Sequence, residues 1–85
     1  MGGETTDTVN VEPDDVLDVQ GENCPIPVIR TKQRIDELEP GGVLEVQATD
    51  PGAERDIPSW ADTTDNEFLG VVSDGDVLRL YIRRN

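Results

Sequence analysis

The sequence predicts an α/β (α+β) two-layer sandwich with elements in the order β-α-β-α-β-β, a four-stranded mixed sheet and two helices on one face. Strand and helix signals alternate along the chain, two segments alternate apolar and polar residues, and a hairpin signal joins the last two strands. One-sided alternation indicates that both helices cover one sheet face and leave the other face wet. Right-handed crossovers would make the first three strands parallel, with the last strand antiparallel.

The first two elements are a strand over residues 15–20, which Gly21 ends, and a helix from about residue 25 to 38. Proline suits the first turn of a helix, where the amide groups have no partner. Ile29 falls outside the apolar stripe and is expected to be exposed. The stripe itself repeats at helical spacing and consists of Val28, Thr31, Ile35 and Leu38.

The middle of the chain predicts a half-buried strand over residues 43–49, followed by a second helix. Asp50 and Pro51 are typical of a helix start, with a capping side chain followed by proline at the first position. Pro58 is expected to kink this helix or to make part of it a tighter turn, because proline removes a helical hydrogen bond. The apolar face of the helix consists of Ala53, Ile57, Trp60 and Ala61.

Two further strands are expected over residues 68–73 and 77–83, joined by a tight turn at Asp74-Gly75. Residues 1–12 are polar, acidic and aperiodic, and we expect them to form a disordered acidic tail. The remaining residues, 13–85, are enough for one small domain.

Charge and residue usage exclude several classes of function. Nineteen acidic and seven basic residues give a net charge of −12, which repels nucleic acids and anionic membranes and is also expected of a halophilic protein. The chain has no histidine and a single cysteine, so it lacks a Cys-His or Ser-His-Asp nucleophile, a zinc site and an internal disulfide. No apolar run approaches the ~20 residues that span a bilayer. We expect a cytoplasmic protein without a zinc site.

Cys24 is the candidate reactive residue, because it stands at the start of the first predicted helix. The partial positive charge of a helix N-terminus lowers a thiol pKa, and the neighbouring prolines stiffen the backbone. Arg30, Lys32 and Arg34 supply a basic patch for a partner protein. Two plainer interpretations stay open: a lone cysteine often serves as a small buried apolar residue, and a run of cations is often a solvated helix face.

Several motifs of the chain resemble the TusA-type sulfurtransferase and sulfur carrier family. They are Leu17-Asp18-Val19-Gln20-Gly21, Cys24-Pro25-Ile26-Pro27-Val28, Pro40-Gly41-Gly42, Asp50-Pro51-Gly52-Ala53 and Arg55-Asp56-Ile57-Pro58. The resemblance implies a fold like the C-terminal domain of a bacterial translation initiation factor. It also implies that Cys24 accepts persulfide sulfur and that the protein needs no metal or organic cofactor. The residues expected to support this site are Gly21, Asn23, Pro25, Pro27, Asp50, Pro51, Arg55 and Asp56.

In such a family the sulfur donor is a cysteine desulfurase or a rhodanese, and the acceptor is a protein of tRNA thiolation, molybdenum cofactor or other sulfur metabolism. The resemblance names neither partner for this chain, and we expect a monomer. Two alternatives remain: a non-enzymatic binding or regulatory module with a translation-factor-like fold, and a protein that handles selenium or redox equivalents through the same thiol.

Overall fold

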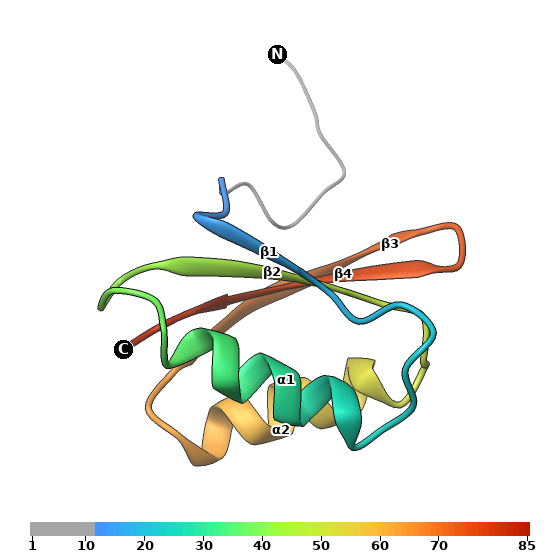
Figure 1. Ribbon diagram of the computed structural model, residues 1–85, viewed down its shortest axis with the longest axis horizontal. Coiled ribbons are helices and arrows are strands. Elements are labelled where there is room, and N and C mark those ends of the chain that lie inside the picture. Colours follow the sequence, from blue (N-terminus) through green and yellow to red (C-terminus); the bar gives the residue numbers. More distant parts are fainter. Residues whose placement is uncertain (1–11) are drawn as a thin grey trace.

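The computed structural model describes residues 12–85, in which two helices cover one face of a four-stranded sheet (Figure 1). The predicted two-layer sandwich and its element order are confirmed. The expected tail over residues 1–12 lies, apart from Glu12, outside the described residues. The elements are β1 (Asp15–Asp18), α1 (Ile26–Ile35), β2 (Val43–Ala48), α2 (Ala53–Thr63), β3 (Glu67–Asp74) and β4 (Val77–Arg83).

The strands lie in the order β1-β2-β4-β3. β1 pairs with β2 in parallel, and β4 is antiparallel to both of its neighbours, β2 and β3. The first three strands therefore run in one direction, as predicted. Their carboxyl ends meet at one edge of the sheet, where the loops that enter α1 and α2 and the β3–β4 turn also lie (Figure 1). Gly75, with φ +63°, provides the left-handed residue that this tight turn needs.

Apolar side chains from the sheet and both helices form the core between the two layers. Every second residue of β2 and β4 packs into this core, as the alternating pattern predicted, and all of them are fully buried except Leu78, which is partly buried. Ile29 is 45% exposed, which confirms its predicted place outside the stripe of α1. The fully buried aliphatic residues include Leu44, Val46, Ala48, Leu80 and Ile82 from the sheet, with Ile35 and Ile57 from the helices. Trp60 is partly buried against this cluster.

The end of α1 differs from the prediction. α1 ends at Ile35 rather than near Leu38, because the chain tightens there: the Leu38 amide donates to the Ile35 carbonyl three residues back. α2 continues through Pro58 as one uninterrupted α-helix. Ile57 and Ala61, on either side of this proline, are both buried, and their packing against the sheet holds the helix together.

The outer face of the sheet is less wet than predicted. Glu45 lies on this face but is only 6% exposed, because the side chains of neighbouring residues cover it. Its two carboxylate oxygens accept hydrogen bonds from Gln47 Nε2 (2.7 Å) and the Tyr81 hydroxyl (3.1 Å). Burial and the Glu45 carboxylate raise the pKa of Tyr81. The buried charge is thus stabilised by two donors.

Thr31 is a polar residue of α1 that is buried between the helices and the sheet. Its side chain is fully buried, and Thr31 Oγ1 has no hydrogen-bond partner among the described residues. A buried unpaired hydroxyl costs about 1–3 kcal/mol, so Thr31→Val is expected to raise the free energy of unfolding by about 1 kcal/mol. Urea denaturation measures this difference. A loss of stability would instead mean that the hydroxyl donates a hydrogen bond, for example to a carbonyl of the preceding turn.

Candidate functional site

Cys24 lies in the loop between β1 and α1, directly before Pro25, the residue that caps α1. Its side chain is half-buried, so it is neither sealed in the core nor fully exposed. The Ile26 amide donates to the Asn23 carbonyl (2.9 Å) and closes the turn that leads into the helix. Pro25 is exposed, whereas Pro27 is buried in the first helical turn and anchors it. The thiol therefore sits at the predicted edge of the sheet.

Hydrogen bonds tie the loop of Cys24 to the loop between β2 and α2. The Gly21 amide donates to Thr49 Oγ1 (2.9 Å), and the Cys24 amide donates to Asp50 Oδ2 (2.8 Å). Gly21 has φ +84°, a conformation that glycine adopts readily at this turn. The structure thus joins Gly21 to Thr49 and Cys24 to Asp50, although 26 residues separate Cys24 from Asp50 in sequence.

Asp50 does not cap the second helix as the sequence predicted. α2 begins at Ala53 with Gly52 as its N-cap, so Asp50 and Pro51 precede the helix instead of capping and opening it. Asp50 Oδ1 accepts the Gly52 amide (3.1 Å) while Oδ2 accepts the Cys24 amide. One carboxylate therefore holds both loops, and these two backbone donors are the main reason why the pKa of Asp50 lies below its usual range.

Gly52 lies beside the sulfur atom, which the sequence analysis missed. A Cβ at this position would lie 3.6 Å from Cys24 Sγ and 3.6 Å from Asp50 Oδ2. Without a side chain, Gly52 leaves one side of the sulfur uncovered. The Asp50-Pro51-Gly52 triplet was the available signal, because it combines a carboxylate with a residue that permits close approach.

The expected lowering of the thiol pKa is wrong. Burial raises the pKa of Cys24 to about 12, and the negative charges of Asp50 and then Asp56 add to this effect. Each contribution favours the uncharged form, because a thiolate would lose water and face two negative charges. The N-terminus of α1 contributes only about half a positive charge against these carboxylates. Cys24 is therefore a protonated thiol in the free protein at neutral pH.

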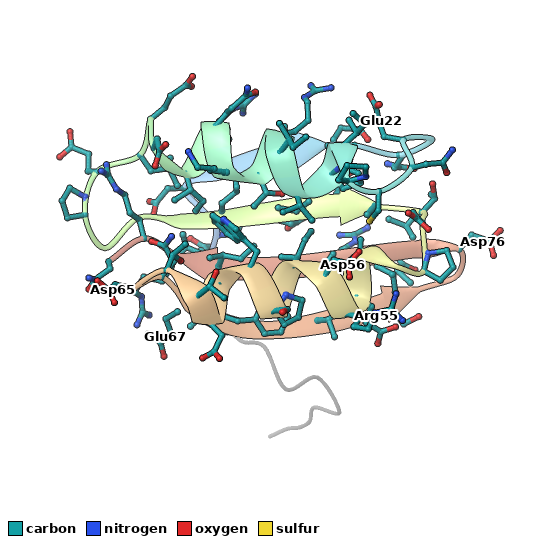
Figure 2. The ribbon with its side chains drawn as sticks, turned by 90° about the horizontal axis from the view of Figure 1, so that it is seen from below. Glu22, Arg55, Asp56, Asp65, Glu67 and Asp76 are labelled. Carbon is teal, nitrogen blue, oxygen red and sulfur yellow. The ribbon has the colours of Figure 1, made fainter. Side chains whose placement is uncertain are left out.

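Arg55 and Asp56 lie together in the first turns of α2. Arg55 Nε is 3.5 Å from Asp56 Oδ1, but the arginine side chain is 82% exposed. Figure 2 shows both residues at the same end of the molecule as Glu22 and Asp76, whereas Asp65 and Glu67 lie at the opposite end. Asp56 thus contributes a carboxylate to the surroundings of the thiol, and Arg55 extends from the same end into solvent.

The three cations of α1 do not form an isolated basic patch. Each has an acidic partner within 4 Å: Arg30 with Glu22 at 3.2 Å, Lys32 with Asp36 at 3.6 Å, and Arg34 with Asp15 at 2.8 Å. Glu22 belongs to the Cys24 loop, so Arg30 is the cation linked to the site. Arg34 packs against β1 near the other end of the helix.

The sequence matches the family described as "Sulfurtransferase TusA" over residues 15–84, nearly the whole of the described region. The chain belongs to this family. The sulfur carrier protein TusA of Pseudomonas fluorescens is 42% identical over 72 residues, which cover 85% of this chain and 90% of that protein. The YrkF protein of Bacillus subtilis is 44% identical over 69 residues, which cover 81% of this chain but only 37% of the longer relative.

A solved structure agrees with this TusA-family assignment. The crystal structure of a SirA-like protein from Desulfitobacterium hafniense superposes with a TM-score of 0.73 at 30% identity, covering 81% of this chain and 95% of that one. Within residues 12–85, no three acidic or cysteine side chains are grouped so that they could hold a metal ion. Neither helix of the described region has the length and apolar character needed to cross a membrane.

Proposed function

We propose that this TusA-family protein is a sulfur carrier that holds sulfane sulfur as a persulfide on Cys24. The observation that carries the proposal is the position of the only thiol in the chain, half-buried at the sheet edge within the region that matches the family. The relative named sulfur carrier protein TusA supports the same role. Transfer through a persulfide needs no metal or organic cofactor, because the sulfur atoms carry out the reaction.

Loading and release are two sulfur transfers of the same kind. The deprotonated Cys24 sulfur attacks the outer sulfur of a donor persulfide, a new S–S bond forms, and the donor cysteine leaves as a thiolate that takes up a proton. An acceptor nucleophile then attacks the outer sulfur on Cys24, and the Cys24 thiolate leaves. One S–S bond replaces another in loading, so no external oxidant or reductant is required.

The partners that we propose are proteins: a cysteine desulfurase or rhodanese as donor and an acceptor of tRNA thiolation, molybdenum cofactor or other sulfur metabolism. Ile26 and Ile29 are exposed on α1 and, with Arg30, offer a mixed apolar and charged surface beside Cys24. Lys32 and Arg34 would extend this surface along the helix. The net charge of −12 argues against direct binding to nucleic acid. A lone thiol suits the reducing cytoplasm, and the proposed form is a monomer.

Incubation with a cysteine desulfurase and free cysteine tests the proposal. The intact mass is expected to rise by one sulfur atom, and cyanide is expected to remove that atom as thiocyanate. Cyanide removes sulfane sulfur but leaves an oxidised thiol unchanged, so it separates sulfur carriage from redox handling. If neither a desulfurase nor a rhodanese charged with thiosulfate changes the mass, the proposed function is wrong.

A further inference from the structure

Gly52 lies at the start of α2, where the backbone does not require a glycine. Its φ is −64° and its ψ is −25°, right-handed values that any residue adopts. Gly21 in the Cys24 loop differs, because its φ of +84° favours glycine. A side chain at position 52 would instead meet the sulfur atom, since a Cβ there would lie 3.6 Å from Cys24 Sγ. What the glycine provides at this position is space beside the thiol.

We propose that Gly52 determines what Cys24 can carry, because it leaves room for the outer sulfur atom of the persulfide. This inference rests on the proposed sulfur-carrier function and deepens it. Beside the bare thiol, a methyl group at 3.6 Å would make only an ordinary van der Waals contact. The space is therefore needed only when the Cys24 sulfur is bonded to a further atom.

The length of an S–S bond shows how much of this space a methyl group would remove. An outer sulfur lies about 2 Å from Sγ, and non-bonded heavy atoms pack at about 3.5–4.0 Å. With a methyl group 3.6 Å from Sγ, any outer sulfur pointing within about 70° of that methyl would come closer to it than about 3.5 Å. A methyl group at position 52 would thus close a wide cone of directions to the persulfide and leave the thiol undisturbed.

Asp50 fixes the width of the space between Cys24 and Gly52. Its Oδ2 accepts the Cys24 amide (2.8 Å), and its Oδ1 accepts the Gly52 amide (3.1 Å). The two loops therefore separate only if a backbone amide loses its partner. The added Cβ would also lie 3.6 Å from Oδ2 and 3.7 Å from Oδ1, so the carboxylate leaves it no free side toward Asp50. A methyl group at position 52 would be held against the sulfur.

The surroundings of Cys24 limit the other directions that an outer sulfur can take. Cys24 is partly buried and packs against the apolar core cluster, which includes Ala53, the residue after Gly52. Gly52 itself is partly exposed, and Pro51 before it is exposed. A sulfur atom beside Gly52 therefore lies near the surface, where a partner protein can reach it, whereas one directed into the core cannot be transferred.

Exchange with glutathione persulfide tests the inference without a protein donor. The Cys24 thiolate attacks the outer sulfur, a new S–S bond forms, and glutathione leaves as a thiolate that takes up a proton. At fixed concentrations of glutathione persulfide and glutathione, the intact mass of the full-length protein gives the equilibrium ratio of loaded to free carrier. In Gly52→Ala this ratio is expected to fall at least about fivefold, the lower end of the penalty for crowding a packed site.

Gly52→Ser is the second variant, because it adds a group of similar size and helix N-caps favour serine. It is expected to be at least as stable as Gly52→Ala and to show the same fall in loading. Glu54→Gln is the matched control, because Glu54 is exposed in the first turn of α2, and its ratio is expected to match the wild type. The inference is overturned if Gly52→Ala loads as well as wild type, if Gly52→Ser does not share the fall, or if Glu54→Gln falls equally.

Unfolding midpoints in urea, measured with and without the added sulfur, separate this effect from damage to the fold. Loading is expected to lower the midpoint of both Gly52 variants and to leave that of wild type nearly unchanged. Equal effects of loading on all three proteins would contradict the inference. A wild type that accepts sulfur from glutathione persulfide but from no protein donor would contradict the proposed function and leave the inference standing.

Discussion

Cys24→Ser is expected to lose sulfur loading completely, with no detectable gain in mass after incubation with a desulfurase and cysteine. A serine oxygen does not form a persulfide under these conditions, and the chain has no second thiol to replace Cys24. The loss is therefore expected to be total rather than partial. Intact-mass spectrometry of wild type and variant, incubated side by side, measures it.

The control for this variant is its stability. Serine has nearly the size of cysteine, Cys24 is half-buried in a loop, and its amide still reaches Asp50, so the fold is expected to be unchanged. If wild type and Cys24→Ser have equal unfolding midpoints, the loss of sulfur loading results from the missing sulfur atom and not from unfolding. Equal sulfur gain on Cys24→Ser would place the sulfur elsewhere and contradict the proposed mechanism.

Ile35→Ala is expected to cause the largest loss of stability among single changes on α1. Ile35 is 1% exposed and belongs to the central core cluster, where deletion of an isoleucine side chain costs about 2–5 kcal/mol. A domain of this size has a small margin of stability, so the variant is expected to be largely unfolded or to melt far below the wild type. Urea denaturation followed by circular dichroism measures the change.

Ile29→Ala is the matched control, because it makes the same chemical change on the same helix. Ile29 is 45% exposed, so its truncation is expected to change the free energy of unfolding by about 0.5 kcal/mol or less. Similar losses for the two variants would contradict the orientation of α1 on the sheet. A larger loss for Ile29→Ala would mean that the helix packs through the opposite face.

The sequence was sufficient for the layers and the directions of the strands, because both follow from local patterns. The alternation of β2 and the stripe of α1 are properties of short windows, and side-chain burial follows directly from them. The position of β4 between β2 and β3 was not predicted. Hairpin chemistry pairs β3 with β4, but nothing local determines which of them also pairs with β2.

For the candidate site, the sequence suggested the residues around Cys24 but predicted the wrong direction for the thiol pKa. Cys24 was placed at a helix start, and the dipole of that helix was its only visible local influence. Burial of the thiol is the largest cause of its raised pKa, and the carboxylates of Asp50 and Asp56, which are distant in sequence, add to it only after β2 and α2 fold. Asp50 was interpreted as the cap of the second helix, but its carboxylate accepts hydrogen bonds from the Cys24 and Gly52 amides before that helix begins.

The central claim is that one sulfur atom travels on Cys24, and peptide mapping tests it most directly. The protein is loaded by a desulfurase, and one sample is taken before and one after incubation with an acceptor thiol protein. Each sample is then blocked with an alkylating reagent and digested with trypsin. The account predicts one extra sulfur on the peptide that ends at Arg30, and its disappearance once the acceptor is added. Extra sulfur on any other peptide, or sulfur that stays on Cys24 with every acceptor tried, would contradict it.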